Sequence, residues 1–163
     1  MSYAQDIVDE FIYHAHIQER FKTRQSRKMR RYINQLNRHI STYLEIKRTV
    51  STKRDYARLA SWIREQTNVF STQLIRIFKR DIRGQIQAEK EWMQKVLPFL
   101  ENMPSDKTVL NKCLFGTFNG VYSVESYIKE IANRILKLWT GQIRIAYTTG
   151  ADLNWVIQQV LGR

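Results

Sequence analysis

The first 97 residues of this chain contain almost no helix breakers, with one glycine, Gly84, and no proline. Glycine and proline interrupt helices more strongly than any other residues, so a stretch this long without them favours long, continuous helices. Its apolar side chains recur at steps of three and four residues, which is the repeat of one helix face. Almost nothing alternates with the period of two that marks strands. We therefore expect an all-α fold.

Two apolar stripes divide this stretch into two predicted helices. The first stripe is narrow, like a coiled-coil seam, and its apolar residues thin out over 23–26, where the sequence is compatible with a kink or break. Ser51 or Thr52 is expected to cap a second helix that runs from about residue 53 to 97. Two such helices joined by a short turn pack as an antiparallel hairpin, here residues 1–97. The first stripe consists of Ile7, Phe11, His14 or Ala15, Gln18, Phe21, Met29, Ile33, Leu36, Ile40 and Tyr43 or Leu44.

A smaller helical unit is expected to follow the hairpin and to pack on it. Pro98 and Pro104 bracket a predicted linker over residues 98–104, and the smaller unit spans residues 105–163. So narrow a stripe on so long a hairpin leaves apolar surface uncovered, so we also expect a homo-oligomer or docking on a larger assembly. The predicted caps and stops of the smaller unit are Ser105 or Asp106 and Gly116, Ser123 and Gly150, and Asp152.

Charge is distributed unevenly along the chain. The formal net charge is +12, yet the first nineteen residues carry four acids and no Lys or Arg. Residues 20–54 carry twelve Lys or Arg and one acid, Glu45. A concentrated positive surface attracts polyanions, of which duplex DNA is the commonest candidate. An anionic membrane, an acidic protein partner or simple solubility are the alternative explanations of this charge.

The basic block lies on the first predicted helix, and its density indicates a helix that is basic all round. Such a helix contacts phosphates without reading bases, so we expect non-specific, salt-dependent binding to double-stranded DNA. The alternative is a solvated helix face without a partner. A sequence-specific helix-turn-helix is not expected, because no pair of short helices with a tight turn lies near the charge. The expected phosphate contacts are Arg24, Arg27, Lys28, Arg30, Arg31 and Arg38.

The sequence contains no motif typical of an enzyme or of a metal or cofactor site. His14 and His16 are two residues apart on a predicted helix and so point to different faces, with no third ligand at a suitable spacing. No phosphate-binding glycine loop, HExxH motif, nucleophile elbow or catalytic carboxylate pair occurs. Asp81, Glu89 and Glu91 lie among Lys and Arg, where we expect solvated ion pairs. We therefore expect a non-catalytic protein without a cofactor.

The single cysteine, Cys113, excludes an internal disulfide framework, and its apolar neighbours indicate a buried position. The chain has no secretory signal and no apolar run of the roughly 20 residues that a membrane span requires. We therefore expect a soluble protein made in a reducing compartment. Four tryptophans could anchor an amphipathic helix at a membrane, which leaves a membrane-active protein as an alternative, but their positions in the apolar lines favour core packing. They are Trp62, Trp92, Trp139 and Trp155.

The order of these elements resembles a known family. An IxxLNR-like element, Ile33–Arg38, lies on the first long helix, and Val96–Pro98 ends the second. A later helix carries Ile145–Gly150, and Val156–Gly162 forms a closing turn. This layout resembles the N-terminal helical region of tailed-phage minor head proteins of the head-morphogenesis type, over nearly the whole chain.

The resemblance implies a bacteriophage virion protein, made in the host cytoplasm and located inside the head or at the neck, near the portal. Related internal ejection proteins can leave the particle with the DNA. The implied partners are double-stranded DNA and the portal or other head or neck proteins. The family usually continues into a second domain, whereas this sequence stops at Arg163, so no role of that domain is carried over. The alternative is a non-virion nucleic-acid-binding accessory protein of packaging or replication.

Overall fold

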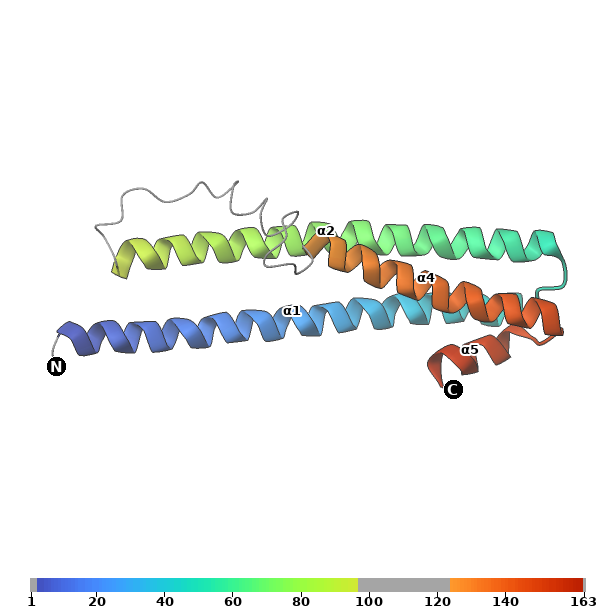
Figure 1. Ribbon diagram of the computed structural model, residues 1–163, viewed down its shortest axis with the longest axis horizontal. Coiled ribbons are helices and arrows are strands. Elements are labelled where there is room, and N and C mark those ends of the chain that lie inside the picture. The colour runs from blue at the N-terminus through green and yellow to red at the C-terminus, as the bar shows by residue number, and fades with distance from the viewer. Residues whose placement is uncertain (1–2, 97–123, 163) are drawn as a thin grey trace. The chain divides into compact units, whose positions relative to one another are not determined.

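The computed structural model describes residues 3–96 and 124–162, and its regular structure there is helical (Figure 1). No strand occurs within these residues, so the expected all-α fold is confirmed. The predicted linker over 98–104, Cys113 and the predicted helix boundaries at Ser105, Gly116 and Ser123 lie outside them. The described helices are α1 (Tyr3–Lys47), α2 (Lys53–Val96), α4 (Val124–Thr149) and α5 (Leu153–Leu161).

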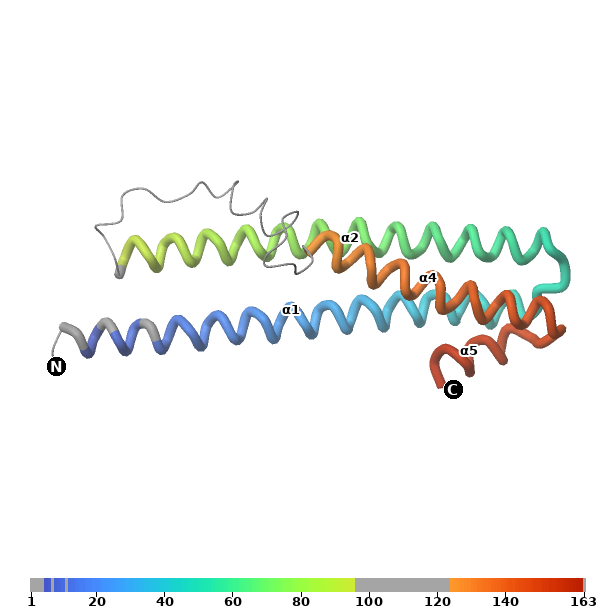
Figure 2. Tube along the Cα trace, in the orientation of Figure 1, coloured from blue at the N-terminus to red at the C-terminus, as the bar shows by residue number. Residues whose placement is uncertain are grey.

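The first helix, α1, is continuous over 45 residues (Figure 2). The break that the sequence allows over residues 23–26 does not occur, because this segment contains no glycine or proline and its backbone stays helical. The hydroxyl of Thr23 donates a hydrogen bond of 3.0 Å to the carbonyl oxygen of Glu19, one turn earlier. A polar side chain is thus satisfied within the helix without interrupting it.

The chain divides into two compact units, and each takes a part of both long helices. Among the described residues, the first unit comprises residues 3–30, 75–96 and 124–125, and the second comprises residues 31–74 and 126–162. The C-terminal helices therefore form one unit with the segments of α1 and α2 nearest the turn between them. Within each unit α1 and α2 run antiparallel, as predicted for a hairpin. The contacts that establish this are His14–Glu89 and Lys28–Asp81 in the first unit, and His39–Gln66 and Tyr43–Trp62 in the second.

Apolar burial is concentrated in the second unit, around the fully buried side chain of Trp139. The indole Nε1 of Trp139 donates a hydrogen bond of 3.0 Å to Oδ1 of Asn37, which satisfies the polar edge of the buried ring. This bond joins α4 to α1. The other buried apolar residues of this unit are Leu36, Ile40, Leu44, Val50, Leu59, Ile63, Phe70, Leu74, Ile128, Ala132, Ile135, Ile143, Ala146, Leu153, Val156 and Ile157.

The helix ends of the second unit follow the predicted caps. The hydroxyl oxygen of Thr52 accepts a hydrogen bond of 3.1 Å from the backbone N–H of Asp55, so Thr52 is the N-cap of α2. Asp152 caps α5 in the same way, through the N–H of Trp155 at 3.0 Å. Gly150, at the end of α4, has a φ of 76°, in the left-handed region that glycine enters without steric cost.

The turn after α1 is held by the last helix. Arg48 has a φ of 66°, which is uncommon for a residue with a side chain. Its carbonyl oxygen accepts a hydrogen bond of 2.8 Å from the backbone N–H of Leu153, the first residue of α5. The side chain of Leu153 is fully buried, so this bond ties the turn to the apolar core of the second unit.

We predict that Asn37→Ala lowers the free energy of unfolding by about 1–3 kcal/mol, because the buried indole N–H of Trp139 then has no acceptor. Asn34, an exposed residue of the same helix, provides the control, since Asn34→Ala makes the same change in helix propensity. Urea denaturation followed by circular dichroism measures both. Equal effects of the two substitutions would contradict the role assigned to the Trp139–Asn37 bond.

Candidate nucleic-acid interface

The facing sides of α1 and α2 in the first unit are joined by polar contacts. Glu89 lies at the centre of one group: its carboxylate contacts Nε2 of His14 at 2.5 Å and accepts hydrogen bonds from Gln18 at 3.2 Å and Gln85 at 3.0 Å. The His14 ring stacks on Trp92, with 3.8 Å between the ring centroids. The side chain of Glu89 is 27% exposed, so the expected solvated ion pair is wrong at this position.

Asp81 is the second carboxylate between these helices. It accepts hydrogen bonds from Nζ of Lys28 at 2.5 Å and from Nε2 of Gln25 at 3.3 Å. Its side chain is 14% exposed, so the expectation of a solvated ion pair is wrong here too. In the described part of the first unit only His14 and Phe78 are buried, so polar contacts contribute more to the link between α1 and α2 here than in the second unit.

This ion pair makes Lys28 different from the other five residues that we expect to contact phosphate. The side chain of Lys28 is 30% exposed, and its ammonium group already neutralises Asp81. The other five are exposed, and none of them forms an ion pair with a residue that the structure describes. They are Arg24, Arg27 and Arg30 in the first unit, and Arg31 and Arg38 in the second.

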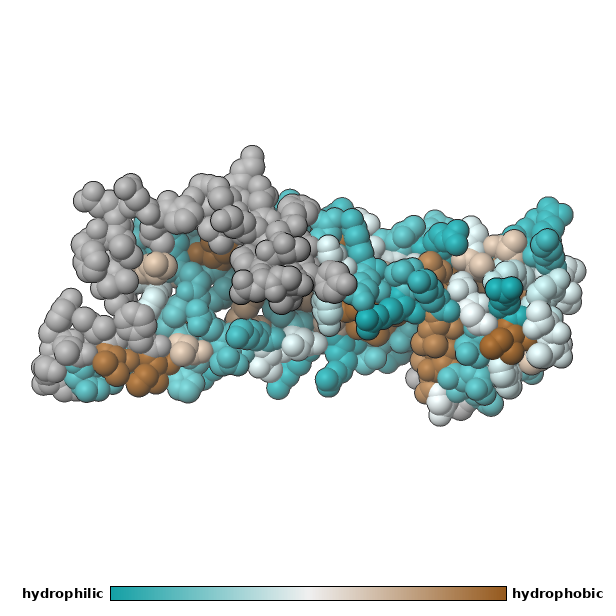
Figure 3. Space-filling view, in the orientation of Figure 1, coloured by the Kyte–Doolittle hydropathy of each residue, from teal (hydrophilic) through white to brown (hydrophobic). Residues whose placement is uncertain are grey.

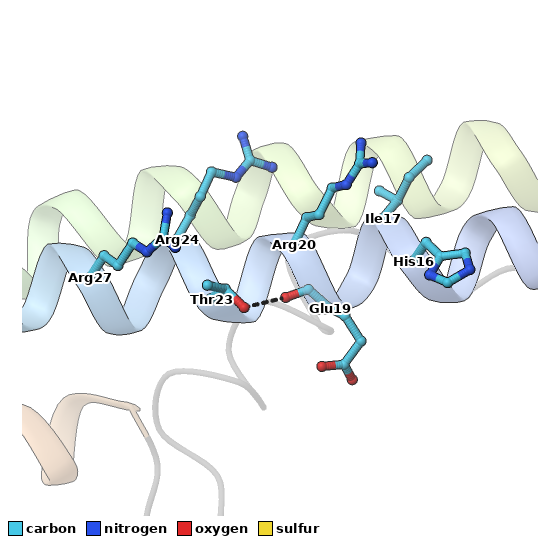
Figure 4. Close-up of a pocket in the computed structure, with 7 residues that line it drawn as sticks. All are labelled: His16, Ile17, Glu19, Arg20, Thr23, Arg24 and Arg27. Atoms are coloured by element: carbon cyan, nitrogen blue, oxygen red, sulfur yellow. Dashed lines mark hydrogen bonds between the residues drawn. The ribbon is translucent and has the colours of Figure 1, made fainter.

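Helical spacing places three arginines of the first unit on one side of α1, next to the face that contacts α2. Arg20, Arg24 and Arg27 follow one another at steps of four and three residues, which confines them to an arc of about 60° at 100° per residue. Figure 4 shows the side chains of Arg20 and Arg24 on one side of α1, with the carboxylate of Glu19 pointing away from them. Arg20 begins the basic run but is not among the expected phosphate contacts, because the density of that run hides the spacing within it.

In the second unit, Arg31 and Arg38 are seven residues apart on α1, which also places them on one face. The guanidinium carbon of Arg31 lies 5.5 Å from the ring centroid of Tyr32, within cation–π range. Such contacts hold the side chain near the helix surface while its N–H groups stay accessible. Both arginines are therefore available to an anion.

The arginine stripe of the first unit borders a surface hollow of about 650 Å³ (Figure 4). Glu19 is the one acid among the described lining residues, against three arginines, so this described part of the lining carries net positive charge and suits an anionic ligand. The lining residues of α1 are His16, Ile17, Glu19, Arg20, Thr23, Arg24 and Arg27.

Comparisons of the chain with models of known protein families, with curated proteins and with solved structures find no match. The described ranges hold no group of three His, Cys, Asp or Glu residues that could bind a metal ion. Among the helices of residues 3–96 and 124–162, none is long and apolar enough to cross a membrane. The exposed arginines of α1 are therefore the feature from which we argue function.

A double-mutant cycle on Lys28 and Asp81 tests whether this pair has a structural role. We expect Lys28→Met and Asp81→Asn each to lower the protection of nearby α1 amides against hydrogen exchange, because each leaves a half-buried group without its partner. The double substitution should lower the free energy of local opening by less than the sum of the two single effects. The difference, which is the coupling free energy of the pair, should be about 0.5–3 kcal/mol.

The exposed pair Lys22–Glu19 provides the control, since its side chains are 74% and 72% exposed. Lys22→Met and Glu19→Gln should show no measurable coupling, because water screens charges at such exposure. Similar coupling in the two cycles would contradict a structural role for Lys28.

Proposed function

We propose that this protein is a non-catalytic, structural protein that binds double-stranded DNA through its phosphates, without sequence preference. The observation that carries the proposal is the set of exposed arginines on α1 that form no ion pair with any described residue. Arginine donates two parallel hydrogen bonds to a phosphate and stays charged at any physiological pH. An unpaired guanidinium gains such bonds without first breaking an ion pair within the protein.

The spacing of these arginines also suits a phosphate backbone. Successive members of the stripe Arg20, Arg24 and Arg27 are separated by about 4.5–6 Å along the helix axis. Charges on duplex DNA are as closely spaced, at about 3.4 Å of axis per phosphate on each strand. Long arginine side chains span the difference, so one face of α1 can reach neighbouring phosphates. Contacts of this kind read no bases.

The setting that we propose is the particle of a tailed bacteriophage, which rests on the resemblance to minor head proteins. A protein inside the head or at the neck lies against densely packed DNA, where cationic side chains replace the counterions of the phosphates. In this proposal the protein is a minor head or internal ejection protein near the portal. Its partners are the packaged DNA and the portal or another head or neck protein.

The salt dependence of DNA binding tests the proposed contacts. We expect the triple substitution Arg24→Gln, Arg27→Gln and Arg30→Gln to weaken binding to a random-sequence duplex. It should also reduce the slope of log K against log salt by roughly 2–3, because each phosphate contact contributes about 0.9 to this slope. Fluorescence anisotropy of a labelled duplex, over a series of salt concentrations, measures both quantities.

A second triple substitution, Arg58→Gln, Arg64→Gln and Arg83→Gln, removes the same charge from exposed positions of α2 and is the matched control. If both triple variants change the slope equally, net charge rather than the α1 arginines drives binding, and the proposed interface is wrong. A strong preference for one sequence or structure over random duplex would favour a packaging or replication accessory protein. Leakage of anionic vesicles without DNA binding would favour a membrane-active protein.

A further inference from the structure

The face of α1 that carries the arginine stripe changes sign along its length. Two acids, Asp6 and Asp9, come first, then Tyr13 and His16, and then the three arginines. Successive members of this series are three or four residues apart, so together they occupy an arc of about 80° on the helix. All of them are exposed. We call this the outer charge face, and it consists of Asp6, Asp9, Tyr13, His16, Arg20, Arg24 and Arg27, all within the first unit.

No described residue neutralises the two acids of this face. Asp9 accepts a hydrogen bond of 3.0 Å from Gln5 on the same helix, and neither Asp6 nor Asp9 forms an ion pair with a described residue. Tyr13 of this face is 62% exposed, and Val8 and Ile12 of the same stretch, at 50% and 53%, are exposed outside the arc of this face. Figure 3 shows apolar surface over this N-terminal part of α1. A DNA phosphate would be repelled by the two acids, so DNA does not account for this part of the face.

An antiparallel copy of the outer charge face is complementary to it. With a twofold axis that passes between positions 16 and 17, Asp6 lies opposite the partner's Arg27, and Asp9 lies opposite the partner's Arg24. The same register places Tyr13 opposite the partner's Arg20, where a cation–π contact can form. Twofold symmetry forms each contact twice, which matches every carboxylate and every arginine of the face with an opposite partner.

We propose that a second copy of this chain docks antiparallel on the outer charge face. Charge complementarity fixes both the direction and the register, because a parallel copy in register would set acids against acids and arginines against arginines. Docking also removes the exposed ring of Tyr13 from water. The interface is isologous, so it closes as a dimer.

This dimer does not rest on the proposed DNA binding, because its register depends on acids that take no part in phosphate contacts. The two partners do share Arg24 and Arg27, so a second copy and duplex DNA compete for these side chains. Arg30, Arg31 and Arg38 remain outside the dimer register. The dimer, like the DNA complex, should weaken as salt is added, since both depend on exposed charges.

Two charge-reversal variants test the register. Asp6→Arg with Asp9→Arg, and separately Arg24→Asp with Arg27→Asp, each place like charges opposite one another throughout the homodimer. We expect the dissociation constant of each homodimer to rise by roughly tenfold or more relative to the wild type. An equimolar mixture of the two variants should form a heterodimer, because every carboxylate then again faces an arginine. Sedimentation equilibrium at low salt measures the masses, and circular dichroism confirms that each variant is helical.

The control variant, Arg58→Asp with Arg64→Asp, reverses the same charge on an exposed part of α2 and should dimerise like the wild type. A wild-type monomer at low salt, or a mixture that stays monomeric, would overturn the proposal. So would homodimers of both reversal variants as stable as the wild type, a result that would move the interface to another surface, such as the exposed Tyr127, Leu138 and Ile145 on α4. A further variant, Asp6→Asn with Asp9→Asn, keeps every arginine and adds no basic residue, so loss of its homodimer with retained binding to a random duplex separates the two proposals.

Discussion

The second unit depends on the burial of one side chain, the indole of Trp139. A tryptophan can enter an apolar core without penalty only if its N–H finds an acceptor, and Asn37 supplies that acceptor from α1. The bond fixes the position along α1 at which α4 packs. The left-handed turn at Gly150 then directs α5 back toward the first turn, where Leu153 binds the carbonyl oxygen of Arg48. Helices that are distant in sequence thus close around a single residue.

The first unit uses a different interaction, and this difference explains why Arg20, Arg24 and Arg27 form no ion pair with any described residue. The carboxylates of Asp81 and Glu89 turn inward, where they hold Lys28 and His14. They are therefore engaged between α1 and α2 and form no ion pair with Arg20, Arg24 or Arg27. The cost of half-burying these acids is met by the hydrogen bonds that surround them. Because these two carboxylates lie between α1 and α2, the contacts between the helices are polar and the exposed arginines of α1 keep their positive charge.

Local patterns predicted the helices because periodicity and capping are properties of neighbouring residues. Thr52, Gly150 and Asp152 were identifiable as helix boundaries from their residue types and positions alone. Contacts between distant residues left no such signal: Asn37 and Trp139 are 102 residues apart, and Lys28 and Asp81 are 53 apart. A lysine in a basic run has the same appearance whether it faces water or a carboxylate.

The residues of the candidate nucleic-acid interface were likewise only partly predictable from local sequence patterns. Charge density identified α1 as the basic helix, but it could not say which side of the helix faces the rest of the protein. That requires the position of α2, and so Arg20 was overlooked while Lys28 was included. The spacing of Arg20, Arg24 and Arg27 was a usable signal, because residues four and seven apart share a face whatever the partner helix does.

The polar link between α1 and α2 in the first unit also sets the order in which the protein comes apart. Segments held by hydrogen bonds and ion pairs open at a lower free energy than segments held by buried apolar surface. The ends of α1 and α2 in this unit can therefore separate while the core around Trp139 stays closed. A protease would therefore cleave within residues 3–30 and 75–96 before it cleaved within the second unit. The arginine stripe Arg20, Arg24 and Arg27 is thus carried by the unit that opens first, whereas Arg31 and Arg38 belong to the unit that stays closed.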